Sequence, residues 1–501
     1  MRGRRRPRRD GKSEGMRPRG AAGRGGAGRP RRPVRDQARN TAFDVMRAVA
    51  ERDAYANLLL PRLLRERGIG GRDAALATEL TYGTLRGLGT YDAIIEVCGD
   101  RAPDPAVRDA LRLGAHQLLK MRVPPHAAVG TSVDLVRLRV GQGAAKFVNA
   151  VLRKIAGRTL EEWVAIVAPD PERDPAGHLA VAHSHPRWVV TAFRDALGED
   201  AAETADLMAA DNDRPLVTLV ARPGRSSAKE LRDAGAEPAR YSPYGAYLPE
   251  GDPGQIAAVA ETRAAVQDEA SQLVTLALTR VPLDGRDERW LDLCAGPGGK
   301  AGLLDAIATH GDLEGLAAPS AQRGEEGPGG GAPRAFPGGA WVMASDVQHH
   351  RARLVLQTTD DALVITADGT APAWRPGAFD RVMLDAPCTG LGALRRRPEA
   401  RWRREPSSVA ELSRLQRELL GTALDSVRPG GVVAYVTCSP HLAETRVVVG
   451  DVLARRDDVE QLDARDYLPG IDGLGEGPHA QFWPHRHGTD AMFLSLLRKR
   501  P

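Results

Sequence analysis

Two cysteines 50 residues apart, Cys388 and Cys438, each follow a strand-like apolar run in the second half of the chain. The first run covers residues 379–385 and the second covers residues 432–437. In a sheet of parallel strands, the carboxyl ends of the strands meet at one edge, where ligands bind. The spacing therefore predicts that one sheet carries both thiols at the same edge.

A third apolar run, residues 290–294, leads into a glycine-rich loop and then into a helical pattern. Glycines after a first strand let the backbone approach a ligand closely. The loop lacks the spacing of a phosphate-binding P-loop, which ends in Gly-Lys-Ser/Thr. We expect it to hold a nucleotide-like cofactor through Cys294, Ala295, Gly296, Pro297, Gly298, Gly299 and Lys300.

Acidic residues end the next three strand-like runs, which cover residues 340–346, 362–368 and 379–385. The acid of the second strand, Asp346, is placed to hold the two hydroxyls of a ribose. Asp368 suits a hydrogen-bond donor such as an adenine amino group. One acid at a strand end is typical of a cap or a turn, but three in order, ending with Asp385, favour a cofactor site.

The expected fold class is multidomain. Residues 36–160 show apolar positions at helical spacing with short Gly/Pro breaks, which predicts an all-α bundle. A small α/β segment is expected over residues 174–260. Over residues 261–501 strands alternate with helices, which predicts a Rossmann-like parallel sheet with helices on both faces. A Gly/Pro-rich stretch, residues 314–340, is expected to be a disordered insertion.

Charge and composition exclude other classes of protein. Residues 1–35 hold thirteen arginines and one lysine against Asp10 and Glu14, so the rest of this +5 chain is mildly acidic. Such an arm suits phosphate backbones, and a dispensable low-complexity tail is the alternative. No apolar run approaches the roughly 20 residues needed to cross a bilayer. Four cysteines are too few for a disulfide framework, so we expect a cytoplasmic protein.

Three segments carry a resemblance to a known family: Cys-Ala-Gly-Pro-Gly-Gly-Lys at 294–300, Asp-Ala-Pro-Cys-Thr-Gly at 385–390 and Thr-Cys-Ser-Pro at 437–440. In this order they resemble the Sun family of S-adenosylmethionine-dependent RNA cytosine-C5 methyltransferases. The helical part, with Phe-Val-Asn-Ala-Val-Leu-Arg at 147–153, resembles the NusB-like RNA-binding domain of the family's small-subunit rRNA enzyme, RsmB. The resemblance implies S-adenosyl-L-methionine as cofactor and RNA as partner. Small-subunit (16S) rRNA is the expected substrate, naked or within the ribosomal particle or its precursor. We expect a monomer with no metal ion and no membrane partner.

The resemblance also implies roles for the thiols. Carbon 5 of cytosine is a poor nucleophile, and addition of a thiolate at carbon 6 makes it an enamine that can attack a methyl sulfonium. The family assigns this addition to the cysteine of Thr-Cys-Ser-Pro, here Cys438, and release of the product to Cys388. DNA cytosine-C5 methyltransferases attack instead from a Pro-Cys motif resembling Pro387-Cys388, so Cys388 stays open as the nucleophile.

Four further elements belong to the expected site. Asp385 is expected to contact the N3 and amino edge of cytosine, or the methionine end of the cofactor. Lys300 is expected to act electrostatically in the same pocket, and Arg351 matches the family pattern and would brace the cofactor pocket. The arginines of residues 395–397 and 401–403 are expected to grip the RNA backbone, with Trp402 packing or stacking.

Other readings stay open. A tRNA cytosine-C5 methyltransferase would use the same chemistry on another substrate. A non-catalytic RNA-binding ribosome-assembly factor would use the cofactor fold as a scaffold, but it has no need of two thiols at one sheet edge. A DNA cytosine methyltransferase predicts that Cys388 alone is essential.

Overall fold

The computed structural model describes residues 36–312 and 338–501. The basic arm expected over residues 1–35 and most of the insertion expected over 314–340 lie outside the described residues. No helix in the described part combines the length and the apolar character needed to span a membrane.

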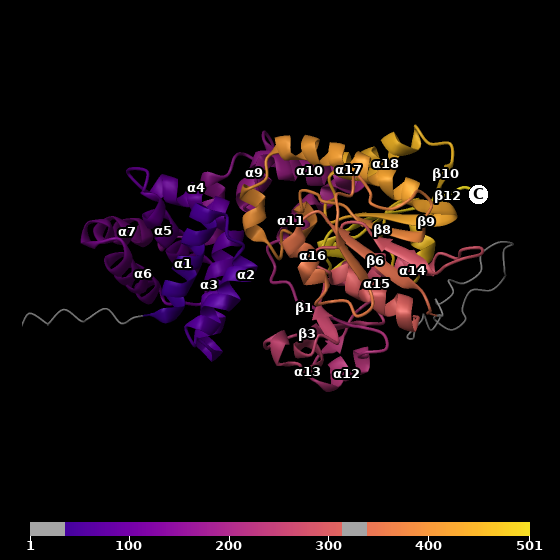
Figure 1. Cartoon of the computed structure of the whole chain (residues 1–501). Coiled ribbons are helices and arrows are strands. Elements are labelled where there is room, and N and C mark those ends of the chain that lie inside the picture. Colours follow the sequence, from indigo (N-terminus) through magenta and orange to yellow (C-terminus); the bar gives the residue numbers. More distant parts are fainter. Residues whose placement is uncertain (1–35, 313–337) are drawn as a thin grey trace, which may run out of the picture. The chain divides into compact units, whose positions relative to one another are not determined.

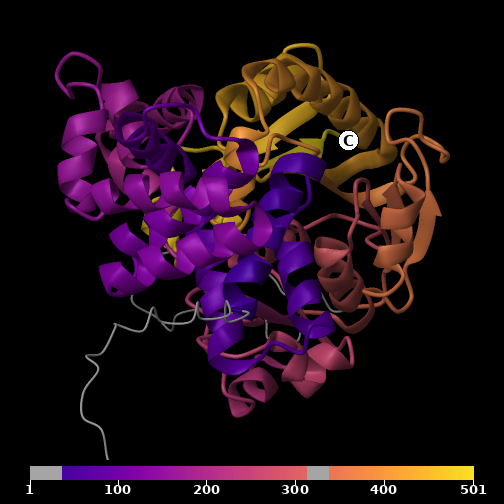
Figure 2. The same ribbon diagram turned by 90° about the vertical axis from the view of Figure 1, so that its left-hand side faces the viewer.

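The first part of the described chain is helical, as the periodicity predicts. The first helix starts at Asp36, whose side chain accepts a hydrogen bond from the backbone N–H of Arg39 at 2.9 Å. The helices of this part are α1 (Gln37–Arg52), α2 (Ala56–Glu66), α3 (Gly71–Arg86), α4 (Leu88–Cys98), α5 (Pro105–Leu119), α6 (Pro125–Arg139) and α7 (Gln142–Ile155). Figure 2 turns this bundle, coloured indigo to purple, toward the viewer.

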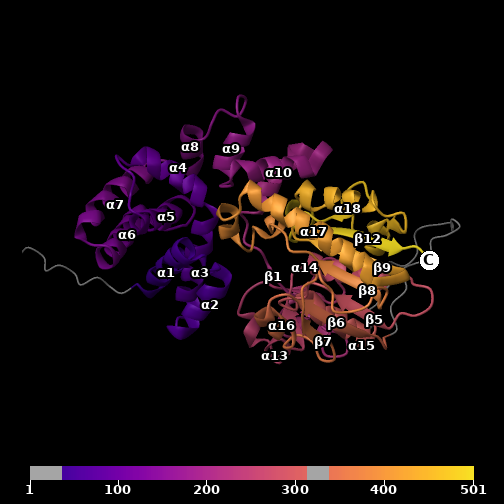
Figure 3. The ribbon, with the colours of Figure 1, turned by 45° about the horizontal axis from the view of Figure 1, so that its top comes forward.

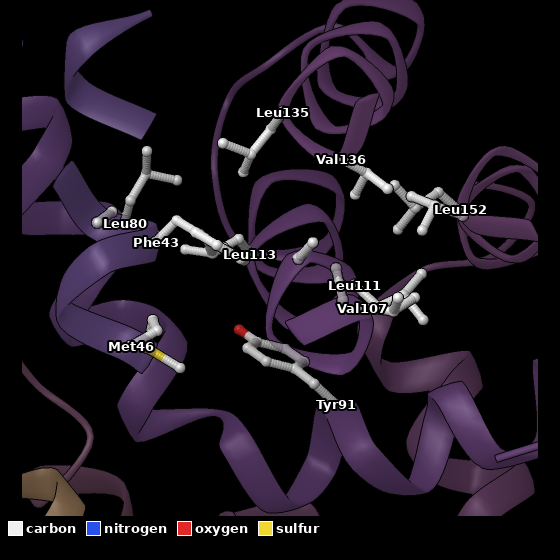
Figure 4. Close-up of a cluster of buried hydrophobic side chains, with 14 of the residues drawn as sticks. Phe43, Met46, Leu80, Tyr91, Val107, Leu111, Leu113, Leu135, Val136 and Leu152 are labelled. Carbon is white, nitrogen blue, oxygen red and sulfur yellow. The ribbon is translucent and has the colours of Figure 1, made fainter. Parts of the chain in front are cut away.

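One apolar core holds the bundle together. Each helix buries residues on one face, and Figure 4 shows labelled side chains of α1, α3, α4, α5, α6 and α7 converging. Removing this apolar surface from water is the main stabilising contribution to the bundle. The labelled members are Phe43, Met46, Leu80, Tyr91, Val107, Leu111, Leu113, Leu135, Val136 and Leu152.

Four more helices and a small antiparallel sheet follow. The helices are α8 (Leu160–Val167), α9 (Pro175–Ala182), α10 (Arg187–Leu197) and α11 (Thr204–Ala210). The strands are β1 (Val217–Ala221), β2 (Glu237–Pro238), β3 (Gly245–Leu248) and β4 (Ala264–Val266), in the order β2-β3-β1-β4. This sheet confirms the expectation of a small α/β segment, and α12 (Ala228–Asp233) and α13 (Ala257–Ala260) accompany it.

The last part is built on a large sheet. Its strands are β5 (Arg289–Asp292), β6 (Trp341–Asp346), β7 (Leu363–Thr366), β8 (Phe379–Asp385), β9 (Val427–Thr437), β10 (Val459–Leu462), β11 (Ala480–Gln481) and β12 (Phe493–Lys499). Their order is β10-β12-β9-β8-β5-β6-β7, with β11 paired to β12. The five strands β9, β8, β5, β6 and β7 are parallel, which confirms the Rossmann-like class.

Helices cover both faces of this sheet. On one face α14 (Glu269–Arg280) and α15 (Gly299–His310) pack over Trp290 and Val342. On the other face α17 (Pro406–Ser426) and α18 (Arg446–Leu453) pack over Leu291 and Val433. Adjacent residues of one strand, such as Trp290 and Leu291, belong to opposite cores because side chains alternate along a strand. Figures 1 and 3 show these helices above and below the strands.

The expectation of a purely parallel sheet is wrong at one end. Strand β12 runs antiparallel to both β9 and β10, between which it lies. A parallel neighbour needs a long crossover, usually a helix. The connection from β10 to β12 contains the short η6 (Ala464–Tyr467) and α19 (Pro484–His487), neither of which is long enough to be one.

A buried arginine ties the helices to the loop that follows β8. Arg401 lies in the 3-10 helix η4 (Pro398–Trp402) and is fully buried. Its guanidinium donates to the carbonyl oxygens of Arg86, Ser184 and Asp211 at 2.7–3.2 Å. It also donates to Oδ1 of Asn212 at 2.7 Å. The side chain therefore satisfies backbone groups from three separate helical segments.

Replacing Arg401 with Met is expected to lower the free energy of unfolding by about 3 kcal/mol, because buried carbonyl groups lose their donors. Arg404→Met is the control, because the half-buried Arg404 side chain makes no hydrogen bond or ion pair within the described residues; it should cost less than about 0.5 kcal/mol. Urea denaturation measures both, and equal effects would contradict the anchoring role.

Candidate active site

The strand order brings the two cysteines together. Strands β8 and β9 are parallel neighbours, and Asp385 lies opposite Val436 in their register. Beyond this point each strand continues into a loop that carries a cysteine. The Sγ atoms of Cys388 and Cys438 lie 3.3 Å apart, within hydrogen-bond distance for sulfur. The prediction that both thiols reach one sheet edge is confirmed.

The two thiols have opposite electrostatic environments. The pKa of Cys438 lies below its ordinary value, first because of its hydrogen bond with Cys388 and further because Lys300 and Arg397 are positively charged. Burial and the carboxylate of Asp385 oppose this shift. The same S–H···S contact, together with burial, holds the pKa of Cys388 well above its ordinary value. Of the two thiols, Cys438 is therefore the one whose thiolate form is favoured.

Lys300 and Asp385 form an ion pair beside the thiols. Lys300 Nζ lies 2.7 Å from Asp385 Oδ2, and the lysine is buried in the first turn of α15 while a third of the carboxylate side chain is exposed. Burial lowers the pKa of Lys300, but the Asp385 carboxylate outweighs it and the net shift is upward. The ammonium therefore keeps its charge and also stabilises negative charge on Cys438.

The glycine loop is held against the end of β6. The backbone N–H of Gly296 donates to Asp346 Oδ2 at 3.1 Å, and Arg351 donates to the Gly296 carbonyl oxygen. A Cβ atom at Gly296 would lie 2.5 Å from the Asp346 carboxylate, so only glycine fits. Gly298 adopts a φ of 107°, in the region that favours glycine. Asp346 and Arg351 thus hold the backbone of the glycine loop in place through their hydrogen bonds with Gly296.

Two polar side chains at this edge have no partner among the residues that the structure describes. Asp292, at the end of β5, is fully buried with both carboxylate oxygens unpaired, and the hydroxyl of Ser345 is likewise buried and unpaired. Burial, reinforced by the charge of Asp385, raises the pKa of Asp292 to about 8. Unpaired buried polar groups are costly, which indicates that this edge takes a polar ligand. Together with the glycine-rich loop, they fit a nucleoside-containing cofactor such as S-adenosylmethionine.

Sequence reasoning did not single out Asp292. In the sequence it lies inside the apolar run 290–294, and only the structure shows that strand β5 ends at this residue.

Two residues expected to contact the cofactor, Asp368 and Cys294, have surroundings that differ from this expectation. Asp368 is exposed beyond the edge strand β7, and its Oδ1 accepts from the backbone N–H and the hydroxyl of Thr370 at 2.9 and 2.8 Å. This is the geometry of a turn cap. Cys294 is half-buried, and burial, followed by the negative charge of Asp292, raises the pKa of its thiol. The raised pKa favours the protonated thiol, so we expect this residue to contact a ligand through its backbone.

A buried carboxylate that sequence reasoning missed joins the two cysteine loops. Glu444 is fully buried and accepts hydrogen bonds from Thr389, the residue after Cys388, through both the backbone N–H and the hydroxyl. It also accepts from the hydroxyl of Ser439, the residue after Cys438, at 2.6 Å. One carboxylate therefore fixes both thiol-bearing loops. A single acid six residues after Cys438 offers no periodic or motif signal of this role.

The expectation for the arginine run is wrong for most of its members. Arg395 and Arg401 are buried and donate to backbone carbonyl oxygens, and Arg396 pairs with Asp268 and Asp490 at 2.7 and 2.9 Å. These side chains are occupied inside the protein. Sequence position could not reveal this, because their partners lie on distant segments.

Trp402 packs against the start of α4, where a Cβ on Gly89 would lie 2.4 Å from its ring, and 39% of the residue is exposed. Packing is thus the reading that the structure supports for this tryptophan.

Comparison with known proteins relates both parts of the chain to described families. The family model for the 16S rRNA methyltransferase RsmB/F matches residues 336–498, and the NusB family model matches residues 36–157. A Mycobacterium tuberculosis protein, whose name assigns a methyltransferase activity and no substrate, is 53% identical over 94% of this chain and 98% of its own length. The ribosomal RNA small subunit methyltransferase B of Erwinia tasmaniensis is 30% identical over 92% of this chain and 98% of its own. The crystal structure of PH0851 matches 93% of this chain and 99% of its own with a TM-score of 0.72; at 21% identity this likeness concerns the fold.

Cys438 is expected to react with iodoacetamide at lower pH in the folded chain than in the same chain unfolded in urea. A lowered pKa means that the thiolate persists until the pH falls through that lower value. Lys300→Met should move the folded-state midpoint upward, because the thiolate loses a neighbouring positive charge. Mass spectrometry of the alkylated peptide across pH measures both, and a folded-state midpoint at or above the unfolded one would rule out the assignment.

Replacing Glu444 with Gln is expected to destabilise the protein by about 2 kcal/mol, because an amide group cannot accept all the hydrogen bonds that the carboxylate accepts. The variant should also lose the low-pH reactivity of Cys438, since the loops are no longer held in register. Glu418→Gln is the matched control on the exposed face of α17. Thermal unfolding and the alkylation profile measure the two effects, and a Glu444→Gln profile like wild type would contradict the role as a clamp.

Proposed function

Because the chain belongs to the family of 16S rRNA methyltransferases RsmB/F, we propose that it methylates carbon 5 of a cytosine in small-subunit rRNA. The coarser part follows from family membership: the protein is an RNA methyltransferase whose cofactor is S-adenosylmethionine. The position of the methyl group and the identity of the RNA are the proposal.

The observation that carries the proposal is the contact of Cys388 with Cys438. Its Sγ–Sγ distance is 3.3 Å, and the pKa values of the two thiols move in opposite directions. Methylation of a ribose hydroxyl or an exocyclic amine needs no thiol. Methylation of cytosine carbon 5 needs a nucleophile to activate the ring and a second group to complete the release. A thiolate beside a thiol supplies both.

The residues proposed to hold the cofactor lie along the carboxyl edge of β5, β6 and β8. Asp346 takes the ribose hydroxyls, and the loop from Cys294 to Gly299 takes the rest of the cofactor by backbone contacts, braced by Arg351. Asp292 and Ser345 offer their unpaired groups to its polar parts. Asp368 can take the adenine amino group only if it exchanges its bonds with Thr370. When bound, the cofactor supplies an electrophilic methyl group.

The protein's own residues activate the base. The Cys438 thiolate adds to carbon 6 of cytosine, and the electron pair moves toward N3, which leaves carbon 5 nucleophilic. We place Asp385 at the N3 and amino edge, where its ion pair with Lys300 holds the carboxylate in position and the Lys300 ammonium offsets the negative charge that develops toward N3. After methylation, Cys388 passes its proton to solvent and, as a thiolate, removes the proton from carbon 5. The C5–H electron pair forms the C5–C6 double bond again, and the Cys438–C6 bond breaks to return Cys438 as the thiolate.

Ribosomal RNA is the substrate that the relatives favour. The Erwinia relative is named for small-subunit rRNA, and the match extends over both the helical part and the catalytic part of this chain. The target base must leave its stack to reach thiols at the sheet edge, so a loop or single-stranded region is the expected target.

The test uses unmodified small-subunit rRNA, prepared by transcription, with S-adenosylmethionine. Wild type is expected to methylate one cytosine, read by bisulfite sequencing. Cys388→Ala should accumulate a covalent protein–RNA adduct on a denaturing gel, since addition proceeds and release does not. Cys438→Ala should give neither adduct nor product, a loss of at least about 10³-fold in rate.

Each alternative has its own outcome in this experiment. The reverse pattern, with an adduct only in Cys438→Ala, would assign the attack to Cys388. Methylation of tRNA and not of rRNA would move the substrate while keeping the chemistry. A wild type that binds S-adenosylmethionine and methylates neither RNA would sink the proposal.

A further inference from the structure

Tyr55 is an exposed aromatic residue that the helical part contributes beside the catalytic loops. It stands at the N-cap of α2, and 44% of the residue is exposed. Two guanidinium groups from the segment after Cys388 approach its ring: Arg403 at 5.2 Å and Arg397 at 5.7 Å from the ring centroid. Because nearly half of Tyr55 is exposed, the ring contributes little to the apolar core, and a role at the surface is expected.

The position of Tyr55 is set by backbone contacts on both sides. The backbone N–H of Ala56 donates to the buried carboxylate of Glu399 at 3.1 Å. Arg403 donates to the carbonyl oxygen of Ala54 at 2.6 Å and also lies 3.7 Å from Asp53. The loop from Asp53 to Ala56 is therefore fastened to η4, and the ring is presented in a fixed place.

Arg397 is free in a way that its neighbours are not. Arg395, Arg396, Arg401 and Arg403 all donate to protein oxygens. In residues 36–312 and 338–501, the exposed guanidinium of Arg397 has no ion-pair or hydrogen-bond partner, and its contact is with Tyr55. Five unused donors beside an aromatic ring suit a nucleotide, whose phosphate accepts hydrogen bonds and whose base stacks.

This pair lies close to the thiols. The backbone N–H of Gly392 donates to the carbonyl oxygen of Cys438 at 2.9 Å, and the next turn ends with the N–H of Arg397 bonded to the carbonyl of Ala393 at 3.0 Å. The segment from Gly392 to Arg397 is thus hydrogen-bonded at its start to the backbone of Cys438. In agreement, the positive charge of Arg397 is among the causes of the lowered pKa of Cys438.

We propose that Tyr55 and Arg397 form a binding site for the RNA nucleotide next to the target cytosine, with the flanking base stacked on this pair and its phosphate held by Arg397. The inference rests on the proposed function, since it assumes an RNA substrate at the thiols. A flipped base leaves a gap in its strand, and a fixed aromatic beside the site stabilises the neighbour that has lost its stacking partner. The helical part then contributes directly to positioning the substrate.

The test measures KM and kcat on transcribed small-subunit rRNA for Tyr55→Ala, Tyr55→Phe and Arg397→Ala. Tyr55→Ala should raise KM about tenfold, and Tyr55→Phe should restore it to within about twofold, because the ring and not the hydroxyl stacks. Arg397→Ala should also raise KM about tenfold. Leu58→Ala, at an exposed position of the same helix, and Arg404→Ala are controls expected to match wild type.

A second measurement locates the contact directly. Cys438→Ala, which binds RNA without reacting, is irradiated with a transcript carrying 4-thiouridine, and crosslinked peptides are identified by mass spectrometry. A crosslink on the peptide that contains Tyr55 is the expected result. Wild-type methylation with unchanged KM in Tyr55→Ala and Arg397→Ala, or crosslinks confined to other peptides, would overturn the inference alone. Absence of RNA methylation by wild type would overturn the proposed function, and the inference with it.

Discussion

The parallel pairing of β8 with β9 is the constraint on which the site depends. It sets Asp385 opposite Val436, so that the loops after the two strands start side by side. The Cys388 and Cys438 sulfur atoms then meet at 3.3 Å, a contact that no local sequence signal could create. The polarisation of the pair, with one thiol donating to the other, follows from this proximity and from the positive charge of Lys300.

Around this pairing, buried charges hold loops in place. Glu444 accepts hydrogen bonds from the residues after both cysteines, and Lys300 pairs with Asp385. Arg401 donates hydrogen bonds to carbonyl groups of three helical segments. Leaving a buried ionic group without a partner destabilises the protein. Each of these contacts therefore favours the backbone arrangement that keeps the group paired. Positions along the catalytic edge are thereby fixed from several directions. The site is preorganised in the sense that its groups need little movement to act.

The arginines of the segment after Cys388 have two kinds of surroundings. Four of its arginines are satisfied by protein oxygens and act as internal fasteners. Arg397 is exposed, and its guanidinium lies beside the Tyr55 ring. In the sequence, this run of arginines suggests a single basic patch. In the fold, four of the arginines bind protein oxygens and Arg397 is exposed. Within this run, the proposed contact with RNA therefore falls to Arg397.

The sequence by itself determined the classes of structure and the chemical parts. Periodicity gives the helical bundle, and alternation of strands and helices gives the Rossmann-like sheet. The glycine loop with Cys388, Cys438 and the strand-end acids Asp346 and Asp385 indicates the edge of the sheet where the candidate site lies, because these signals are local. Tertiary structure alone decided the antiparallel place of β12, the clamp by Glu444, the unpaired carboxyl of Asp292 and the burial of Arg401. Each of these depends on a partner distant in sequence, and without the fold a buried carboxylate or arginine reads the same as a solvated one.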